Sequence, residues 1–493
     1  MATISLERST PEAQGISSEA LLAFLAGAEA KGLELHSLML LRHGKVLAEG
    51  WWSPYGPDKI HLLYSLSKSF TSSAIGLAVD EGLLKLDDKV ISFFPDKLPE
   101  KLNPHLEAMT VHHLLSMGTG HRTDTTDYIL SQTPNDPVKG FLSLLPEEAP
   151  GSIFCYNSGA TFMLSAILQK LTGEKLVDYL EPRLFKPLGI NKKYWLETPN
   201  GITQGFSGLH VVTESIAKFG QLYLQDGIWE GKRLLPKGWV KLASQKHIEN
   251  KGTSENIDWQ QGYGYQFWRC QHDTYRGDGA FGQYCVIMPK HDAVLAITSA
   301  VINMQDVLDL AWEHLLPAFE TGELEPNINA QASLKDKLSR AKLEPVIGQA
   351  SSPISQTVSG KTYLVDEYQD EKGRGTLPQM SAFRFDFNQS DWQLELQTPE
   401  GLAQLSGGYS EDKPGSSSYS QMRGSLTHHG ESRVSVSGAW TKDEVFQLCL
   451  RFIETPHSLT MSFHFEGTKA KIERRWNVSF GPLELSTLSA QQH

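Results

Sequence analysis

The hydrophobic periodicity of the chain changes near residue 359, and this change constrains the fold more than any other feature. Beyond it, apolar and polar side chains alternate, as in the FRFDF segment at residues 383–387. A period of two places alternate side chains on opposite faces of a strand, so several such segments predict an antiparallel sandwich or barrel. Before residue 320, long segments such as ATFMLSAILQKLTG follow helical spacing instead. A chain of 493 residues with both patterns is expected to form more than one domain.

The boundaries follow from local composition. We expect a first domain at residues 1–320, a linker at residues 321–358 and an antiparallel β-domain at residues 359–493. The linker is polar and rich in Pro, Ser and Gln, as in PVIGQASSPISQ, which is typical of a connecting segment. The first domain mixes predicted helices with a few short strands, including AVLAITSAV, and this mixture predicts an α+β fold.

The charge of the chain limits its partners. The formal net charge is −12 and no long Lys/Arg run interrupts it, so nucleic acid and anionic membrane surfaces are not expected as partners. No stretch approaches the roughly 20 apolar residues of a membrane helix, and the N-terminus lacks the basic and apolar regions of a signal peptide. We therefore expect a cytoplasmic protein without membrane contact.

The sequence predicts neither a metal site nor a cofactor. The cysteines show no paired spacing, and the adjacent pairs His112-His113 and His428-His429 would point their rings in different directions. GDGAFG, at residues 277–282, matches the dinucleotide-binding pattern G-x-G-x-x-G. A strand that ends at Pro289 follows it, however, instead of the helix that such a loop must open.

The strongest chemical signal is the segment YSLSKSF at residues 64–70. A serine hydroxyl attacks a carbonyl only when a base removes its proton, and Lys68 lies one helical turn after Ser65, on the same face. At a helix start, free backbone N–H groups also stabilise a developing oxyanion. The Ser-x-x-Lys spacing alone is not specific because it occurs elsewhere in the chain, but Ser65 opens a long apolar helix that would half-bury the pair.

At this point the chain resembles the superfamily of serine β-lactamases and penicillin-binding proteins, particularly its class C-like esterase and peptidase branch. The resemblance spans about residues 10 to 318 and includes the segments HLLYSLSKSFTSSAIGLAVDEGLLKLDDKVISFFP, MTVHHLLSMGTGH and PGSIFCYNSGATFMLSAILQKLTG. It implies a β-lactamase-like antiparallel sheet flanked by helices, with a helical lobe. The following all-β domain resembles the lipocalin-like barrels found after some members, although a sandwich remains an alternative.

The resemblance also implies the roles of three residues. Ser65 would be the acylated nucleophile, Lys68 its base, and Tyr156 a second proton-transfer group. From chemistry alone, a phenol beside a lysine can share general-base work, but a tyrosine at a helix start can equally be a packing residue.

Two departures from the family pattern concern the substrate-binding residues. The usual Tyr-x-Asn is here Tyr156-Asn157-Ser158, so either Asn157 or Ser158 could make the contact of the usual asparagine.

In the third family motif, which is Lys-Thr-Gly or His-x-Gly, the best match here is Asp278-Gly279-Ala280, followed by Phe281. An anion in place of a cation would repel substrate carboxylates, so we expect neutral esters or amine-bearing amides to be better substrates than acids. By analogy, the backbone N–H groups of Ser65 and Phe281 would form the oxyanion hole.

These patterns predict a serine hydrolase that cleaves small-molecule esters or amides, with a carboxylesterase-like activity favoured. A peptidase or amidase for D-amino acids and a weak β-lactamase are alternatives. A sensor or binding protein that has lost turnover is an alternative of another class, and formation of a homo-oligomer stays open.

Overall fold

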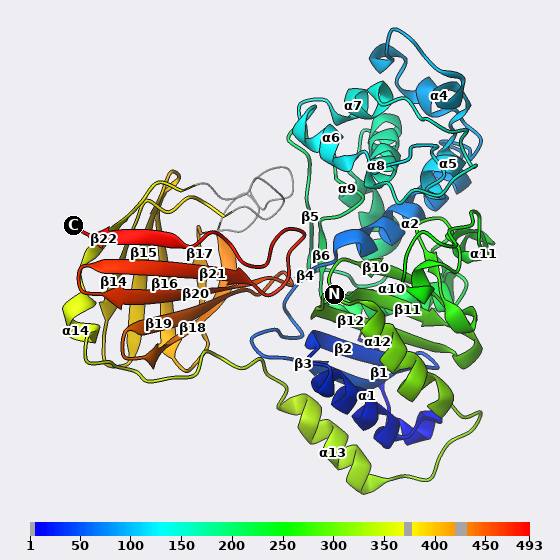
Figure 1. The fold of residues 1–493 in the computed structure, drawn as a ribbon. Helices are drawn as coiled ribbons and strands as arrows, with labels where there is room; N and C mark the ends of the chain where they lie inside the picture. Colours follow the sequence, from blue (N-terminus) through cyan, green and yellow to red (C-terminus); the bar gives the residue numbers. More distant parts are fainter. Residues whose placement is uncertain (1–4, 369–376, 420–430) are drawn as a thin grey trace. The chain divides into compact units, whose positions relative to one another are not determined.

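The computed structural model describes residues 5–368, 377–419 and 431–493. The chain packs into two units, the first formed by residues 1–51 and 62–340 and the second by residues 52–61 and 341–493 (Figure 1). Helices and strands contribute similar shares, 31% and 29%. Their distribution confirms the predicted fold class, because the helices concentrate in the first unit and the second unit consists mainly of strands.

A seven-stranded sheet forms the centre of the first unit. Its neighbours pair in antiparallel fashion, except for the short parallel contact between β1 and β3. All residues of β11 and β12 are buried, as expected for strands covered on both faces. In spatial order the strands are β1 (Glu7–Arg8), β3 (Lys45–Trp51), β2 (Glu34–Arg42), β12 (Ala293–Ala300), β11 (Gln283–Met288), β10 (Tyr275–Gly279) and β9 (Trp268–Arg269).

Helices flank this sheet, and α10 packs across β2, β11 and β12. A second group packs around α1, where Gly27 allows close contact with Leu310 of α12. The helices of this part are α1 (Ser18–Ala30), α2 (Ser67–Asp80), α10 (Thr213–Leu224), α11 (Trp239–Ser244), α12 (Gln305–Leu310) and α13 (Ile328–Ser339).

Short helices gather into the predicted helical lobe beside α2 (Figure 1). They are α3 (Val90–Phe93), α4 (Pro104–Ala108), α5 (Val111–Leu115), α6 (Thr126–Ser131), α7 (Pro137–Ser143), α8 (Ser158–Thr172) and α9 (Leu176–Leu180). Among the described residues, no helix combines the length and apolar character needed to cross a bilayer.

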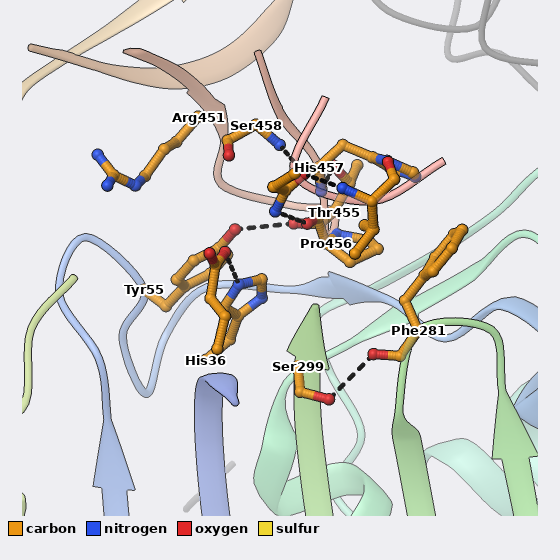
Figure 2. Close-up of polar contacts among 12 residues, drawn as sticks. His36, Tyr55, Phe281, Ser299, Arg451, Thr455, Pro456, His457 and Ser458 are labelled. Atoms are coloured by element: carbon orange, nitrogen blue, oxygen red, sulfur yellow. Dashed lines mark hydrogen bonds and ion pairs between the residues drawn. The ribbon is translucent and has the colours of Figure 1, made fainter. Parts of the chain in front are cut away.

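The boundary between the units differs from the predicted linker at residues 321–358. Helix α13 packs against α1 and β3 through Leu334 and Leu338, and the latter side chain lies against the backbone of Gly50. Residues 52–61 instead belong to the second unit, where Tyr55 Oη donates to the carbonyl oxygen of Thr455 at 2.9 Å (Figure 2). A few apolar side chains within a polar segment thus decide which unit the segment joins.

The second unit is a closed barrel, which decides between the two β-architectures expected from the sequence. Closure occurs where β16 pairs in parallel with β18, at Gly408 and Ser437. The nine barrel strands are β16 (Gly401–Tyr409), β15 (Asp391–Thr398), β14 (Ala382–Phe387), β13 (Thr362–Val365), β22 (Leu488–Gln492), β21 (Lys469–Trp476), β20 (Ser458–Glu466), β19 (Val445–Phe452) and β18 (Ser432–Lys442). Strand β17 (Lys413–Ser417) adds to β18, and the short helix α14 (Ser355–Val358) precedes the barrel.

The barrel core follows directly from the alternation in the sequence. In β14 the side chains of Phe383, Phe385 and Phe387 are buried, whereas Arg384 between them is exposed. Gly407 has no side chain at the position where the indole of Trp392 packs against the backbone. Alternate residues of neighbouring strands thus fill the interior with aromatic rings, as expected for a small barrel.

Candidate active site

Helix α2 is buried although its sequence, SKSFTSSAIGLAVD, is rich in serine. Its hydroxyls bond to surrounding segments: Ser69 Oγ donates to the carbonyl of Gln266 at 2.8 Å, and Thr71 Oγ1 donates to the carbonyl of Gly205 at 2.8 Å. Gly76 allows Trp239 to approach the helix backbone. Because buried polar groups are stable only when hydrogen-bonded, these contacts fix the helix and the position of its first turn.

The first turn holds the predicted serine and lysine together. Lys68 Nζ lies 2.9 Å from Ser65 Oγ and 3.0 Å from the carbonyl oxygen of Phe206. The Lys68 side chain is 1% exposed, and Ser65 lies in the short 3₁₀ turn at Tyr64–Leu66 that leads into α2. Tyr64 has a left-handed φ of 48°, a strained conformation that occurs preferentially at functional sites.

Tyr156 is positioned by the start of α8. Asn157 caps this helix: its Oδ1 accepts from the N–H of Gly159 at 3.0 Å and from Thr125 Oγ1 at 2.8 Å. Asp124 Oδ1 accepts from the N–H of Ser158 at 3.0 Å. These contacts fix the start of α8, and the ring centroid of Tyr156, the residue before the cap, lies 4.7 Å from Lys68 Nζ.

Aromatic rings surround Tyr156. Its ring stacks on that of Trp268, with centroids 5.2 Å apart and planes inclined by 18°, and it meets Tyr263 edge to face at 6.1 Å. Burial raises the pKa of Tyr156, the negative charge of Asp278 adds to this increase, and a hydrogen bond with Ser65 opposes it. The phenol therefore keeps its proton at neutral pH.

Strand β10 approaches the nucleophile segment closely because it carries glycine at two positions. A Cβ at Gly279 would lie 1.9 Å from the carbonyl oxygen of Leu63 and 3.1 Å from the nitrogen of Ser65. A Cβ at Gly277 would lie 2.5 Å from Ser69 Oγ. Any side chain at residue 279 would displace the strand, so this glycine permits the approach.

Asp278 is not the isolated anion that the sequence suggested. Its Oδ2 accepts from Arg276 Nε at 2.9 Å, and the two side chains are 6% and 0% exposed. Burial raises the pKa of the Asp278 carboxyl, whereas Arg276 and then Lys68 act in the opposite direction. The charge of Asp278 is thus balanced by its neighbour two residues earlier, on the same face of the strand.

The turn after β10 contains the other predicted residues. Ala280 is half-buried, and Phe281 has a left-handed φ of 66°. The Phe281 carbonyl accepts from Ser299 Oγ at 3.0 Å, as Figure 2 shows, and from the N–H of Val301 at 3.0 Å. The ring of Phe281 meets that of Tyr64 edge to face at 5.6 Å. These contacts hold the turn to its own sheet and to the residue before Ser65.

The structure thus brings Ser65, Lys68 and Tyr156 together and places Gly279 beside Ser65. It separates the roles of the two residues left open by the sequence. Asn157 is fully buried and its Oδ1 is used by the helix cap, while Ser158 is 9% exposed at the first position of α8.

Sequence reasoning missed three residues of this site: Phe206, Trp268 and Arg276. The carbonyl of Phe206 and the ring of Trp268 come from distant segments, and no local signal marks them. Arg276 did leave a signal, because residues two apart on a strand share a face and Arg276 precedes Asp278 by two.

The structure adds no candidate metal site to this arrangement. Among the described residues, no group of three or more His, Cys, Asp or Glu side chains could hold a metal ion. His112 donates to or accepts from Tyr265 Oη at 2.6 Å, and His113 Nδ1 accepts from the N–H of Thr110 in a helix cap. The pair His428-His429 lies outside the described residues.

Comparisons with known proteins give a family match and several similar proteins. The family model described as Beta-lactamase matches residues 26–314. The chain is similar to the 6-aminohexanoate-dimer hydrolase of Paenarthrobacter ureafaciens, with 24% identity over 289 residues that cover 54% of this chain and 72% of that protein. It is also similar to esterase EstB of Burkholderia gladioli, with 25% identity over 179 residues that cover 31% of this chain and 44% of that protein.

Two solved structures show a similar fold. One is the octameric penicillin-binding protein homologue from Pyrococcus abyssi, with a TM-score of 0.50 and 17% identity over 96% of this chain and 99% of that chain. The other is EstCE1, described as a hydrolase with promiscuous acyltransferase activity, with a TM-score of 0.50 and 16% identity over 60% of this chain and 99% of that chain. At these identities the likeness concerns the fold alone.

Proposed function

Because the chain belongs to the beta-lactamase family of serine hydrolases, we propose that it hydrolyses carboxylic esters through a covalent acyl intermediate on Ser65. The observation that carries this proposal is the 2.9 Å contact between the buried Lys68 Nζ and the Oγ of the half-buried Ser65, with the half-buried Tyr156 beside them. A base within hydrogen-bond distance of the hydroxyl is the first requirement for a serine nucleophile.

Acylation begins when Lys68 takes the proton of Ser65 and the Ser65 oxygen attacks the substrate carbonyl. The carbonyl of Phe206 accepts from the same amine at 3.0 Å, so it holds the nitrogen in place before and after the proton moves. A second acceptor of this kind restricts the amine to one geometry, which favours a reactive alignment.

The oxyanion that forms would lie between the backbone N–H of Ser65 and an N–H of the turn at Ala280 and Phe281. The close approach at Gly279 supports this arrangement, because it brings the start of that turn next to the Ser65 nitrogen. Preorganised backbone donors of this type stabilise the tetrahedral intermediate more than the ground state.

Tyr156 would supply the proton for the leaving group. Burial, and then the charge of Asp278, keep its pKa above that of an ordinary phenol, so it begins the reaction protonated. After the alcohol leaves, water attacks the acyl group. Tyr156 then takes back a proton from this water, and Lys68 returns its proton to the Ser65 oxygen as the acid is released.

The surroundings of the site favour substrates without a carboxylate near the reacting bond. A lysine in the third motif would offer a positive charge, whereas Arg276 and Asp278 balance each other here. The half-buried rings of Phe154 and Trp259 join Trp268 in an aromatic cluster next to Tyr156, and such rings bind apolar groups. The similarity to the 6-aminohexanoate-dimer hydrolase supports a second candidate, the hydrolysis of linear amides.

The test compares p-nitrophenyl butyrate, a D-aminoacyl p-nitroanilide and a carboxylated β-lactam on wild-type protein and Ser65→Ala. We expect the ester to be hydrolysed fastest, and Ser65→Ala to lose at least about 10⁴-fold in kcat. Ser72→Ala is the matched control on the same helix, because the Ser72 hydroxyl has no hydrogen-bond partner among the described residues. It should keep nearly full activity.

Labelling with a fluorophosphonate probe completes this test. Wild-type protein and Ser72→Ala should be modified at Ser65, and Ser65→Ala should not. Ester turnover that survives in Ser65→Ala would overturn the assignment of the nucleophile. A wild-type protein that neither reacts with the probe nor turns over any of the three substrates would favour a binding protein that has lost catalysis.

A further inference from the structure

Arg276 is the most completely enclosed charged group near the site. Its Nε donates to Asp278 Oδ2 at 2.9 Å and its Nη1 donates to the carbonyl of Asp258 at 2.7 Å. The guanidinium lies 4.1 Å from the ring centroid of Trp259 and 5.7 Å from that of Trp268. The Nη2 atom has no hydrogen-bond partner among the residues that the structure describes. A cation this deeply buried is stabilised mainly by its carboxylate partner and by aromatic faces.

A continuous series of contacts joins this pair to the reacting groups. The Arg276 guanidinium, which Asp278 holds, lies 5.7 Å from the centroid of the Trp268 ring, and the Trp268 ring stacks on that of Tyr156 at 5.2 Å. The ring of Tyr156 in turn lies 4.7 Å from Lys68 Nζ. The charge of Asp278 acts on both Lys68 and Tyr156. The pair is therefore linked to the site by packing and by electrostatics.

The two charges of the pair have opposite consequences for the site. A lone carboxylate near Lys68 and Tyr156 would favour their protonated forms, whereas a lone guanidinium would favour the deprotonated forms. In a buried environment neither effect is screened well by solvent. Arg276 therefore offsets part of the effect that Asp278 has on the reacting groups, and the pair also positions Trp268.

We propose that Arg276 and Asp278 act as one positioning unit: Asp278 fixes the Arg276 guanidinium against Trp268, which stacks on Tyr156, and Arg276 offsets the charge of Asp278 so that Lys68 and Tyr156 exchange protons near neutral pH. This inference rests on the proposed function and adds to it two residues that need not touch the substrate. It also replaces the expectation that Asp278 selects substrates by their charge.

Other titratable groups face the same region, and each variant below leaves them unchanged. They are Asp124 before α6, Asp258 and Tyr263 between α11 and β9, Cys270 after β9, and Tyr284 on β11. Differences among the variants therefore report on the pair itself.

The test is a double-mutant cycle on the pH dependence of kcat/KM with p-nitrophenyl butyrate. Arg276→Met should move the acid limb of the profile to higher pH by about 1 unit, because it leaves Asp278 as a lone anion. Asp278→Asn should move the limb to lower pH by a similar amount. The double variant, which removes both charges, should return the limb to within about 0.3 unit of the wild-type position, since the two effects cancel only as a pair.

A merely structural pair predicts a different pattern. Both single variants would then lower stability and kcat without shifts of opposite sign, and the double variant would not restore the pH profile; this result would overturn the inference. The matched control is the ion pair of Lys218 and Glu214 on α10, with nitrogen and oxygen 3.0 Å apart. Lys218→Met and Glu214→Gln should leave the acid limb in place.

A second measurement covers variants that fold poorly. The rate of fluorophosphonate labelling at Ser65, followed against pH, needs only the folded fraction of the protein. If Arg276→Met does not accumulate, Arg276→Lys is used as a variant that keeps the positive charge. A wild-type protein that is not labelled contradicts the proposed function, and the inference with it. If Ser65 is labelled but the pH dependence of labelling does not shift in opposite directions in Arg276→Met and Asp278→Asn, the inference is contradicted while the proposed function stands.

Discussion

Both units gather aromatic side chains in their interiors, but they surround them with different partners. In the first unit, Tyr156 lies between the ring of Trp268 and the amine of Lys68, with the Arg276–Asp278 ion pair next to the cluster. In the barrel, the Phe385 ring contacts Phe387 at 5.0 Å, Phe446 at 5.2 Å and Phe463 at 4.8 Å, within a cluster made of apolar and aromatic residues.

Burial therefore has a different main effect in each unit. In the barrel, burial removes apolar surface from water and so supplies stability. Around Tyr156, the same low-dielectric surroundings strengthen every charge interaction and raise the pKa of the phenol. Substitutions in the site should therefore change chemistry more than stability, and substitutions in the barrel core should do the reverse.

After loss of the nucleophile itself, the largest expected effect on chemistry is that of Lys68→Met. It removes the proposed base from the site, and kcat/KM for ester hydrolysis should fall by about 10³-fold or more. The thermal midpoint should stay close to that of wild-type protein, because methionine fills a similar volume and does not need to bury a polar amine. Steady-state kinetics and calorimetry on the same sample would contradict this expectation if both quantities fell together.

Phe385→Ala should have the largest effect on stability. Removing a fully buried ring from the barrel creates a cavity and lowers the free energy of unfolding by about 3 to 5 kcal/mol. Chemical denaturation followed by near-ultraviolet circular dichroism measures this loss. Gln393→Ala on the neighbouring strand, where the side chain is exposed, should change stability by no more than about 0.5 kcal/mol. Equal losses in the two variants would contradict the role of the aromatic core.

A smaller effect is expected for Gly279→Ala. The added methyl group would lie 1.9 Å from the carbonyl oxygen of Leu63, so β10 must move away from Ser65. We expect kcat/KM to fall by about 10- to 100-fold, since small displacements of reacting groups have effects of this size. Gly322→Ala, where an added Cβ meets nothing within 4 Å, should leave activity unchanged. An active Gly279→Ala would show that the close approach is dispensable.

The smallest expected effect concerns acid stability of the first unit. Burial lowers the pKa of His113 to about 4, with contributions from His112 and Lys89. The unfolded chain then binds the proton more tightly than the folded unit, so stability present above pH 6.5 is lost as pH falls from 6.5 towards 4. With partial exposure taken into account, the loss is about 1 kcal/mol. Thermal unfolding between pH 7.5 and 5 should show it, and His113→Gln should flatten the dependence; a flat wild-type curve would contradict it.

Much of the fold could be predicted because its signals are local. The period of two in FRFDF places Phe383, Phe385 and Phe387 on one face, and these residues are in the barrel core. The family resemblance of residues 10 to 318 is confirmed by the match at residues 26–314. The end of the first unit was predicted less accurately, because the polar segment after residue 320 contains only a few apolar side chains that pack on α1 and β3.

The candidate site was predicted unevenly for the same reason. Helical geometry places Ser65 and Lys68 on one face whatever surrounds them, and the structure shows them 2.9 Å apart. The partners of Lys68 and Tyr156, such as the Phe206 carbonyl and the Trp268 ring, come from segments more than 100 residues away in the sequence. Only packing of the whole unit brings them into contact.

By itself, the sequence determined the two periodicities, the spacing of the serine and the lysine, and the family. These depend on residues close together along the chain, whose relative positions the backbone geometry fixes. The tertiary structure decided that the β-domain closes into a barrel, that Asn157 caps a helix, and that the charge of Asp278 is balanced by Arg276. Those outcomes depend on strand closure, burial and the local dielectric, which exist only once distant segments have packed together.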